Sequence, residues 1–234
     1  MPAGAPSLTM LCIAEPGTSG VAMKDSAKRA LAALAATVGI ATQALAIEPG
    51  QVVANFRLLD QRGESHELYR LADKKAVVVM VQGNGCPIVR QALPALVEVR
   101  ARYLNRGVEF LLLNSNLQDT RELVAREANE FKIEFPILLD ESQHTGEALG
   151  VVRTSEVFVI DPKSWELKYR GPMDDRLSYE RQRPAKHHYL TDALDAMLAG
   201  KPVQTPQADG VGCLVNFPER ARKTSHISKP ASTE

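Results

Sequence analysis

The chain has 234 residues, of which 44% are hydrophobic and 24% are charged, a composition typical of a globular protein with one well-buried domain and tails. Its 28 basic residues balance its 28 acidic residues. This balance gives no electrostatic basis for binding nucleic acid or an anionic surface, so we expect no nucleic-acid partner.

The N-terminal segment has the order of pieces that is typical of a secretory signal peptide. A short positive region from Met23 to Arg29 precedes an apolar, small-residue stretch from Ala30 to Ala41, and Ala44-Leu45-Ala46 matches a small-x-small cleavage site. We therefore predict a signal peptide over residues 23–46 and a periplasmic or secreted protein. The alternative is an amphipathic or buried alanine-rich helix. The apolar stretch is too short for a membrane span, and we expect no stable span in the mature chain.

The segment before Met23 is rich in Pro, Gly and Ser and has no periodic pattern. Because a signal peptide begins at the initiator, we interpret residues 1–22 as a non-native leader and Met23 as the true start. The mature domain is then expected over residues 47–217, followed by a disordered polar tail over 218–234. Cys12 would be removed, which leaves Cys86 and Cys213.

The first half of the mature chain predicts a hairpin, a buried strand and a long helix. Two strand-like runs, Val52 to Leu59 and Ser65 to Leu71, flank the turn residues Asp60 to Gly63, and an apolar run from Ala76 to about Gln82 follows. From Pro87 the apolar residues recur at spacings of three and four until Asn105-Arg106-Gly107, which indicates a helix with a kink at Pro94.

The second half predicts an alternation of strands and helices that ends in a hairpin and a closing helix. Asp119 is the expected N-cap of a helix that runs to about Phe131, with Glu122 three residues later. The other expected elements are strands Val108–Leu113, Phe135–Leu139, Val157–Ile160 and Glu166–Arg170, and helices Glu141–Leu149 and His188–Gly200. This order predicts an α/β fold with a mixed central sheet and helices on both faces.

Cys86 lies where the buried strand breaks at Gly83-Asn84-Gly85 and the helix begins at Pro87. A cysteine at a helix N-terminus is near unpaired amide groups and the positive end of the helix dipole, which favour the thiolate. The carboxyl end of a central strand is also where working sites lie in such sheets. We therefore predict Cys86 to be the nucleophile of a catalytic site.

Two cysteines in an exported protein indicate a disulfide. A bond between Cys86 and Cys213 could be a purely structural staple between the body of the fold and the C-terminal segment. It could instead be redox-active, because Cys86 has an activating position and Cys213 lies in a flexible-looking segment. We favour the second interpretation.

These residues resemble the redoxin branch of the thioredoxin-fold superfamily, the group related to alkyl hydroperoxide reductases and thiol-specific antioxidants (AhpC/TSA). The resemblance spans about residues 51–217 and implies a thioredoxin-like fold. Its pieces include Gly85-Cys86-Pro87, Gly107 to Phe110, Asn114-Ser115-Asn116, Phe135 to Leu138, Arg153-Thr154, Tyr169-Arg170-Gly171 and Gly212-Cys213.

Three positions depart from the pattern of this superfamily. Val89 stands where thioredoxins have a second cysteine, so a resolving thiol must come from elsewhere in the chain. Gly83 stands where peroxiredoxins carry a peroxide-positioning Thr or Ser. Ser155 occupies the usual position of a cis-proline, and we expect a trans peptide there because a cis bond before a non-proline residue costs about 2.5–4 kcal/mol.

The resemblance implies an antioxidant or thiol-disulfide oxidoreductase, and we expect no cofactor and no metal. Cys86 would attack a peroxide or a disulfide, Cys213 would resolve the product, and a reducing thiol protein would reset the pair. Arg153 and Thr154 would orient the substrate and stabilise the thiolate. The alternative for these two is an ordinary surface arginine and a threonine that starts a strand.

Two other functions stay open at this point. Cys86 and Cys213 could bind Cu(I) together with a histidine or Met173, because thiolate and thioether ligands select that ion. The domain could also be a non-catalytic binding module with a permanent disulfide. We interpret Asp174-Asp175 as turn residues and His187-His188 as a solvated flank rather than a metal site.

Overall fold

The structure, a computed structural model, describes residues 46–218. The predicted leader, nearly all of the predicted signal peptide and residues 219–234 of the predicted tail lie outside the described residues, so the structure does not test them. The described part forms the α/β fold that the sequence predicts, with one mixed sheet of seven strands.

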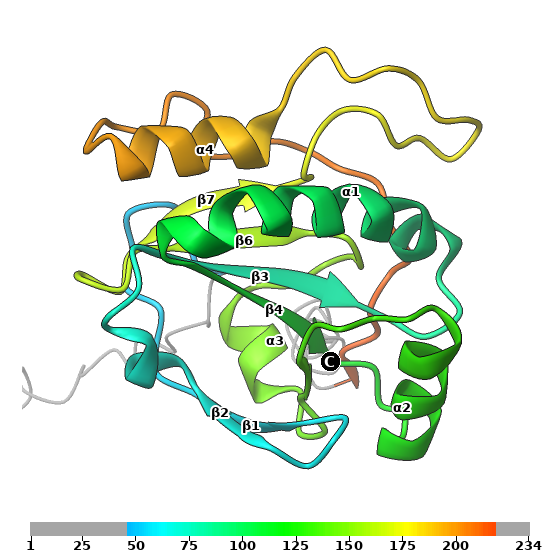
Figure 1. Ribbon diagram of the computed structural model, residues 1–234. Helices are drawn as coiled ribbons and strands as arrows, with labels where there is room; N and C mark the ends of the chain where they lie inside the picture. The colour runs from blue at the N-terminus through cyan, green and yellow to red at the C-terminus, as the bar shows by residue number, and fades with distance from the viewer. Residues whose placement is uncertain (1–45, 219–234) are drawn as a thin grey trace, which may run out of the picture. The chain divides into compact units, whose positions relative to one another are not determined.

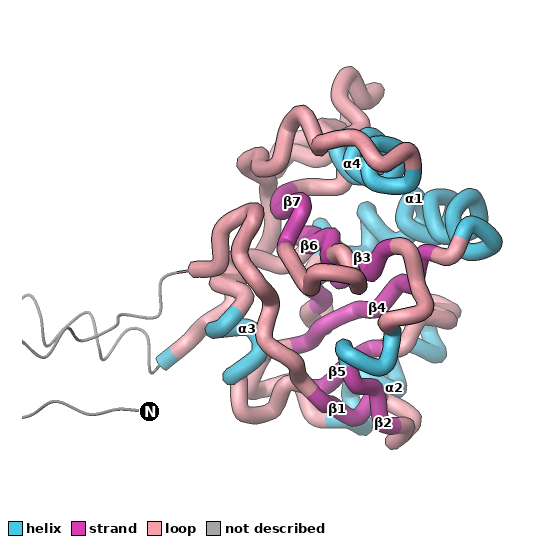
Figure 2. Tube along the Cα trace, turned by 90° about the vertical axis from the view of Figure 1, so that its left-hand side faces the viewer, coloured by secondary structure: helices cyan, strands magenta, loops and turns pink. Residues whose placement is uncertain are grey.

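The strands of the sheet follow one another in the order β2-β1-β5-β4-β3-β6-β7, and Figure 2 shows them stacked in this order. The central strand β3 pairs parallel with β4, and β4 with β5, whereas β6 joins β3 antiparallel and β7 joins β6 antiparallel. Their bounds are β1 Arg57–Asp60, β2 Ser65–Glu67, β3 Ala76–Gln82, β4 Val108–Asn114, β5 Ile137–Leu139, β6 Val157–Ile160 and β7 Leu167–Gly171.

Helices cover the two faces of this sheet. In Figure 2, α1 and α4 lie on one side of the strands and α3 lies on the other. The bounds are α1 Pro87–Tyr103, α2 Arg121–Glu130, α3 His144–Ala148 and α4 Tyr189–Leu198, with short 3-10 turns at Leu68–Leu71 and Leu104–Arg106. The expectation of helices on both faces is therefore confirmed.

Alternation along β3 explains why the fold has two hydrophobic cores. Val78 and Met80 face the core that contains the apolar side of α1 and Leu190 and Leu194 of α4. Their neighbours in β3 point to the opposite face, where the second core includes residues that flank α3 and the N-terminal segment. All seven β3 residues are buried, as expected for a strand covered on both sides.

The N-terminal hairpin and the α2 cap differ in detail from the prediction. β1 and β2 pair antiparallel as expected, but Leu68–Leu71 forms a 3-10 turn instead of extending the strand. The N-cap of α2 is Thr120, whose Oγ1 accepts the Leu123 N–H, and not Asp119. Asp119 does not cap α2, because its carboxylate accepts the Asn84 N–H of the loop that precedes Cys86.

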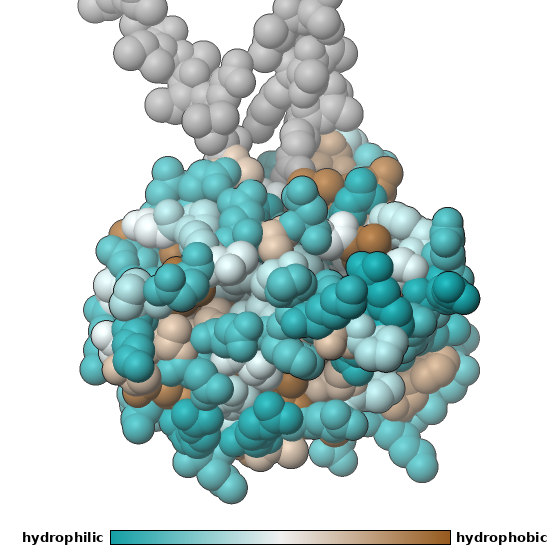
Figure 3. All heavy atoms as spheres, turned by 90° about the horizontal axis from the view of Figure 1, so that it is seen from above, coloured by the Kyte–Doolittle hydropathy of each residue, from teal (hydrophilic) through white to brown (hydrophobic). Residues whose placement is uncertain are grey.

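The surface over α1 and α4 has hydrophobic residues scattered among hydrophilic ones, as Figure 3 shows. Within residues 46–218, no helix combines the length and the apolar character that crossing a bilayer requires.

Candidate active site

Cys86 is the N-cap of α1, as the sequence predicts. Its backbone is extended (φ −72°, ψ 115°), and Pro87 opens the helix. The turn between β3 and α1 is tight: Gly85 has φ +71°, a left-handed conformation that favours glycine, and Cys86 N–H donates to Gly83 O over 3.3 Å. The sulfur is therefore held at the end of the central strand and at the start of a 17-residue helix.

Two carboxylates from the other side of the site hold this turn in place. Asp119 Oδ2 accepts the Asn84 N–H at 2.9 Å, and Glu127 Oε2, on α2, accepts the Gly85 N–H at 2.7 Å. Glu127 also faces the Arg90 guanidinium at 3.5 Å. The two amides that precede Cys86 are thus already occupied by protein anions. The sequence does not predict these contacts of Asp119 and Glu127, because no local pattern distinguishes a carboxylate that binds a distant loop.

Asp119 is the centre of a wider polar network. Besides the Asn84 amide, its Oδ2 accepts from the side-chain amides of Asn114 and Asn116 at 2.9 and 3.0 Å. Asn114 in turn donates to Gln82 at the end of β3. The network connects the carboxyl ends of β3 and β4 to the start of α2, and we call this hydrogen-bonded Cys86 side of the site the platform.

Cys213 lies in the segment 206–217, which follows α4 and which we call the strap. In Figure 1 it is the orange-to-red segment that runs from α4 past the N-terminal end of α1 toward α3. Cys213 forms a disulfide with Cys86, with the two Cα atoms 6.3 Å apart and 127 positions apart in sequence. The sequence predicted this pair as a possibility, and the structure brings the two residues together.

Thr154 connects the two halves of the site. Its Oγ1 lies 3.1 Å from Cys86 Sγ and accepts the Cys213 N–H at 2.9 Å, while its own N–H donates to Cys213 O at 2.9 Å. Arg153 pairs with Leu214 in an antiparallel bridge, and its Nη1 donates to the Tyr179 hydroxyl at 3.2 Å. Because side chains alternate along such a pairing, Thr154 faces the disulfide and Arg153 faces away from it.

Close backbone approaches explain two glycines of the site. A Cβ at Gly83 would lie 2.9 Å from the Thr154 methyl group and 2.5 Å from the Asn116 amide nitrogen. No side chain fits there without movement, which accounts for the missing Thr or Ser at this position. A Cβ at Gly212 would overlap the Thr154 carbonyl oxygen, so glycine lets the strap pack directly on residue 154.

Ser155 adopts φ +64°, an uncommon backbone conformation for a residue with a side chain. Its N–H donates to Val81 O at 2.7 Å, which ties the loop to β3. Its hydroxyl is buried and has no protein partner. Ser155 lines a cavity of about 320 Å³ between this loop, the Glu156–Arg170 ion pair and strap residues Gln207 to Val211. Beside this cavity the strap is bonded to β7, since the Arg170 N–H donates to Pro206 O and the Ala208 N–H donates to Arg170 O.

Other residues that the sequence singled out have structural roles. Met173 is buried in the core that contains α1 and α4. Asp175 accepts the His187 and Lys186 amide N–H groups, which hold the pKa of its carboxyl below the ordinary value, and Asp174 accepts the Arg176 N–H. These are the turn roles that the sequence predicts.

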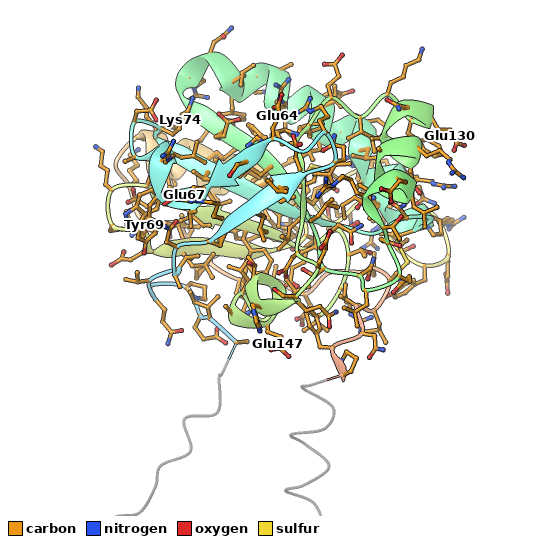
Figure 4. All side chains as sticks on the ribbon, turned by 90° about the horizontal axis from the view of Figure 1, so that it is seen from below. Glu64, Glu67, Tyr69, Lys74, Glu130 and Glu147 are labelled. Carbon is orange, nitrogen blue, oxygen red and sulfur yellow. A yellow bond between two sulfur atoms is a disulfide. The ribbon has the colours of Figure 1, made fainter. Side chains whose placement is uncertain are left out.

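Both thiols that the soft-metal alternative would use are joined in the disulfide in this structure, so that alternative concerns the reduced pair. One group of potential metal ligands occurs within residues 46–218: Asp60, Glu64 and His66. It lies on the β1–β2 hairpin, where Figure 4 labels Glu64. Arg62 already pairs with the buried Asp60 carboxylate there, at 3.0 Å.

The chain is similar to proteins of known sequence and structure. Thiol-disulfide oxidoreductase ResA of Halalkalibacterium halodurans is 30% identical over 132 residues, which cover 56% of this chain and 73% of that protein. ResA of Geobacillus thermodenitrificans is 30% identical over 135 residues, 56% of this chain and 75% of that protein.

Among solved structures, a hypothetical protein from Sinorhizobium meliloti has a TM-score of 0.67 and 30% identity, covering 74% of this chain and 96% of that one. An uncharacterized conserved protein from Geobacillus kaustophilus has a TM-score of 0.66 and 28% identity, covering 73% and 93%. A putative thiol:disulfide interchange protein DsbE from Chlorobium tepidum shares the fold at 19% identity, with a TM-score of 0.55 and coverage of 65% and 99%. The family model of Redoxin matches residues 48–180, more than half of the sequence, and the chain therefore belongs to the Redoxin family.

Proposed function

We propose that this protein is an exported thiol-disulfide oxidoreductase in which Cys86 is the nucleophile and Cys213 is the resolving thiol. The observation that carries the proposal is the disulfide between a helix N-cap cysteine and a cysteine on the strap, 127 positions away. Membership of the Redoxin family and similarity to thiol-disulfide oxidoreductase ResA support it.

The reaction proceeds by thiol-disulfide exchange. With the pair reduced, the Cys86 thiolate, favoured by the α1 N-terminus, attacks a substrate disulfide and forms a mixed disulfide while the substrate releases one thiolate. The Cys213 thiolate then attacks Cys86 Sγ, which releases the second substrate thiolate and closes the bond found here. A dithiol protein returns two electrons to the pair. In this proposal the Thr154 hydroxyl, which lies 3.1 Å from Cys86 Sγ, orients the incoming sulfur.

A peroxide is the second candidate substrate, and the same Thr154 hydroxyl favours it, because it could hydrogen-bond a peroxide oxygen beside the sulfur. We rank disulfides first. The Asn84 and Gly85 amides are occupied by Asp119 and Glu127, so they are not free to bind a peroxide oxygen.

Export of the protein is part of the proposal. The signal-peptide pattern over residues 23–46 supports it, and disulfides persist mainly in oxidising compartments. The expected mature N-terminus is Ile47. Mass determination of the N-terminal peptide after expression in a bacterium checks this, and a retained residue 23–46 segment would contradict it.

The activity is tested with a protein-disulfide substrate and single-cysteine variants. Reduced wild-type protein should reduce insulin catalytically with a dithiol present. Cys86→Ser should lose this activity entirely, whereas Cys213→Ser should form a mixed disulfide once and then stall, visible as an adduct by intact mass. A parallel assay with hydrogen peroxide separates the two substrates. Equal activity of Cys86→Ser and wild type would overturn the proposal.

A further inference from the structure

A cleft at the end of the sheet opposite the disulfide combines cationic side chains with an apolar wall. Its volume of about 590 Å³ lies within the range of about 300–1,000 Å³ that is typical of small-ligand pockets. We infer that this cleft binds a small organic anion with an apolar chain, of the fatty-acid carboxylate class. The inference does not depend on the proposed function, because the cleft contains no residue of the cysteine pair.

Four segments of the chain meet at this cleft. They are the start of β3, the β6–β7 turn with the adjoining part of β7, the C-terminal end of α4, and residues 200–203. In Figure 1, α4 ends and β3 begins on the left, whereas α1 begins on the right, after Cys86. β3 has seven residues, so at about 3.3 Å per residue it separates the two ends of the sheet by roughly 23 Å. A small ligand in the cleft is therefore remote from the disulfide.

Cationic side chains predominate in the lining of the cleft. Lys168 is already neutralised, because its Nζ contacts the Glu166 carboxylate and lies 4.0 Å from the Asp161 carboxylate. The other three lysines are exposed and form no ion pair within residues 46–218: Lys75, Lys163 and Lys201. An anion in the cleft would thus meet positive charges that no carboxylate of the described chain neutralises.

The inner wall of the cleft is apolar and continuous with the hydrophobic core. Met197, Leu198 and Val203 line the cleft, are partly buried, and pack against the core that contains α1 and α4. Pro202 adds a fourth apolar side chain between Lys201 and Val203. An apolar chain laid along this wall would remove both surfaces from water, which is favourable.

The helix end at the cleft does not cancel the lysine charges. A helix C-terminus carries a partial negative charge that resides on carbonyl groups without partners. At the end of α4, the N–H groups of residues 199–201 donate to the carbonyls of residues 195–197. Gly200 permits this ending with φ +67°. The carbonyls are therefore largely satisfied, and the lysines determine the sign of the potential.

The combination of charge and apolar surface indicates the class of ligand. Exposed lysines alone would form an ordinary solvated face, and an apolar wall alone would accept any apolar molecule. A carboxylate with an apolar chain uses both parts, because its head pairs with the ammonium groups and its chain covers the wall. An inorganic anion uses only the lysines, and a cation with the same chain is repelled by them.

Isothermal titration calorimetry of the oxidised protein with octanoate tests this class. We expect the affinity to rise about threefold per methylene from butanoate to octanoate, and to fall as salt screens the lysines. Octylammonium and inorganic phosphate each carry half of the chemistry and should bind about tenfold more weakly than octanoate. Equal binding of octanoate and octylammonium would overturn the inference. So would the absence of octanoate binding at millimolar concentration.

Charge reversal tests the position of the site. Lys201→Glu should weaken octanoate binding by about fivefold, because it replaces an unpaired cation with an anion, and Lys75→Glu should act in the same direction. Lys186→Glu is the matched control, since Lys186 is exposed on the loop between β7 and α4 and does not line the cleft. It should leave the affinity unchanged. Equal weakening in the control would mean that only net charge matters, which contradicts a site here. Urea unfolding of all three variants checks that they are folded.

An anionic membrane offers the same chemistry from a different source, and vesicles distinguish it from a free ligand. Sedimentation with phosphatidylglycerol vesicles should show no binding that Lys201→Glu removes. Vesicle binding that this change abolishes, in a protein that does not bind octanoate, would overturn the inference and make the cleft a membrane contact. Octanoate binding that is sensitive to Lys201→Glu but not to Lys186→Glu supports the inference.

Discussion

The two cysteines of the site are held in different ways. Cys86 lies in a turn whose amides are bound by Asp119 and Glu127 and whose ends are fixed by β3 and α1. Cys213 lies on a strap that is held near it by a few hydrogen bonds to Thr154 and Tyr179 and that borders a cavity over residues 207–211. The strap also has backbone hydrogen bonds to Arg170 and Val152, but it forms no regular element, whereas the Cys86 turn joins a central strand to a helix.

This difference supports the roles that we propose for the two sulfurs. A rigid helix N-terminus stabilises a thiolate in a fixed position, which suits the nucleophile and the leaving group. The proposed function requires that Cys213, on the irregular strap, separates from Cys86 to admit a substrate and returns to resolve the product. Changes to the strap, to the platform and to the contact between them should therefore have different effects on stability and on reactivity.

Reducing the disulfide should have the largest effect, because it frees the strap. Chain-entropy arguments give about 5 kcal/mol for a loop of this length, and the two cysteines are 127 positions apart. We expect the free energy of unfolding in urea to fall by up to that amount on reduction, with the protein still folded. Cys213→Ser, which has no disulfide, is the control and should show no dependence on reductant. Equal stability of oxidised and reduced wild type would show that noncovalent contacts hold the strap.

Thr154→Val should weaken the contact between platform and strap. The change keeps the shape of the side chain but removes the acceptor of the Cys213 N–H. An unsatisfied buried donor costs about 1–3 kcal/mol, so the oxidised form should lose that much unfolding free energy. Thr191→Val is the matched control, because the Thr191 hydroxyl donates to His188 O at a helix end remote from the disulfide. If both variants lose the same stability, Thr154 has no special role in holding the strap.

Asp60→Asn changes the hairpin, outside both regions, and should separate stability from redox chemistry. Burial opposes the charge of Asp60, but the Glu64 and Arg62 N–H groups, the Arg62 guanidinium and His66 outweigh it and hold the pKa of the carboxyl below its ordinary value of 3.8. A lowered pKa stabilises the fold above the unfolded-state pKa, and this stabilisation disappears as the pH falls through the folded-state pKa.

The variant should therefore be about 1–2 kcal/mol less stable than wild type at pH 7, and the difference should shrink below about pH 4. Urea unfolding at pH 7, 4 and 3 measures it. The rate of disulfide reduction should not change. A slower reduction in this variant would mean that the hairpin and the site are coupled.

Glu127→Gln should have the smallest effect, and it acts on the platform alone. It removes a negative charge beside the α1 N-terminus while keeping an oxygen that can accept the Gly85 N–H. Charges at this position are worth about 0.3–1 kcal/mol, so alkylation of reduced Cys86 at pH 6 should become about two- to fivefold faster. Arg90→Gln removes the opposite charge and should slow alkylation. Changes in the same direction would indicate a loosened turn instead of an electrostatic effect.

The sequence predicts the platform better than the strap. The apolar run of β3, the glycine turn and the periodicity of α1 are local patterns, and they place Cys86 correctly at the N-cap. The strap has no such pattern, since residues 206–217 form isolated bridges rather than a regular element. Its path follows from tertiary contacts, which a sequence pattern does not encode.

The same limit applies to the anchors of the turn. Asp119 looks like a helix cap in sequence because its spacing to Glu122 fits, yet its carboxylate is used by Asn84, 35 positions away. Glu127 lies inside a helix and shows no local signal for its contact with Gly85. Long-range hydrogen bonds of this kind are where a local reading fails.

The central claim is that the Cys86–Cys213 pair is a redox-active, reversible couple. Its most direct test equilibrates the protein in thiol–disulfide buffers of known potential, quenches with acid, alkylates, and counts free thiols by intact mass. We expect a two-electron transition between about −270 and −120 mV, the range of catalytic dithiol proteins. A pair that stays oxidised below about −300 mV, the range of structural disulfides, would contradict the account and make the bond a staple.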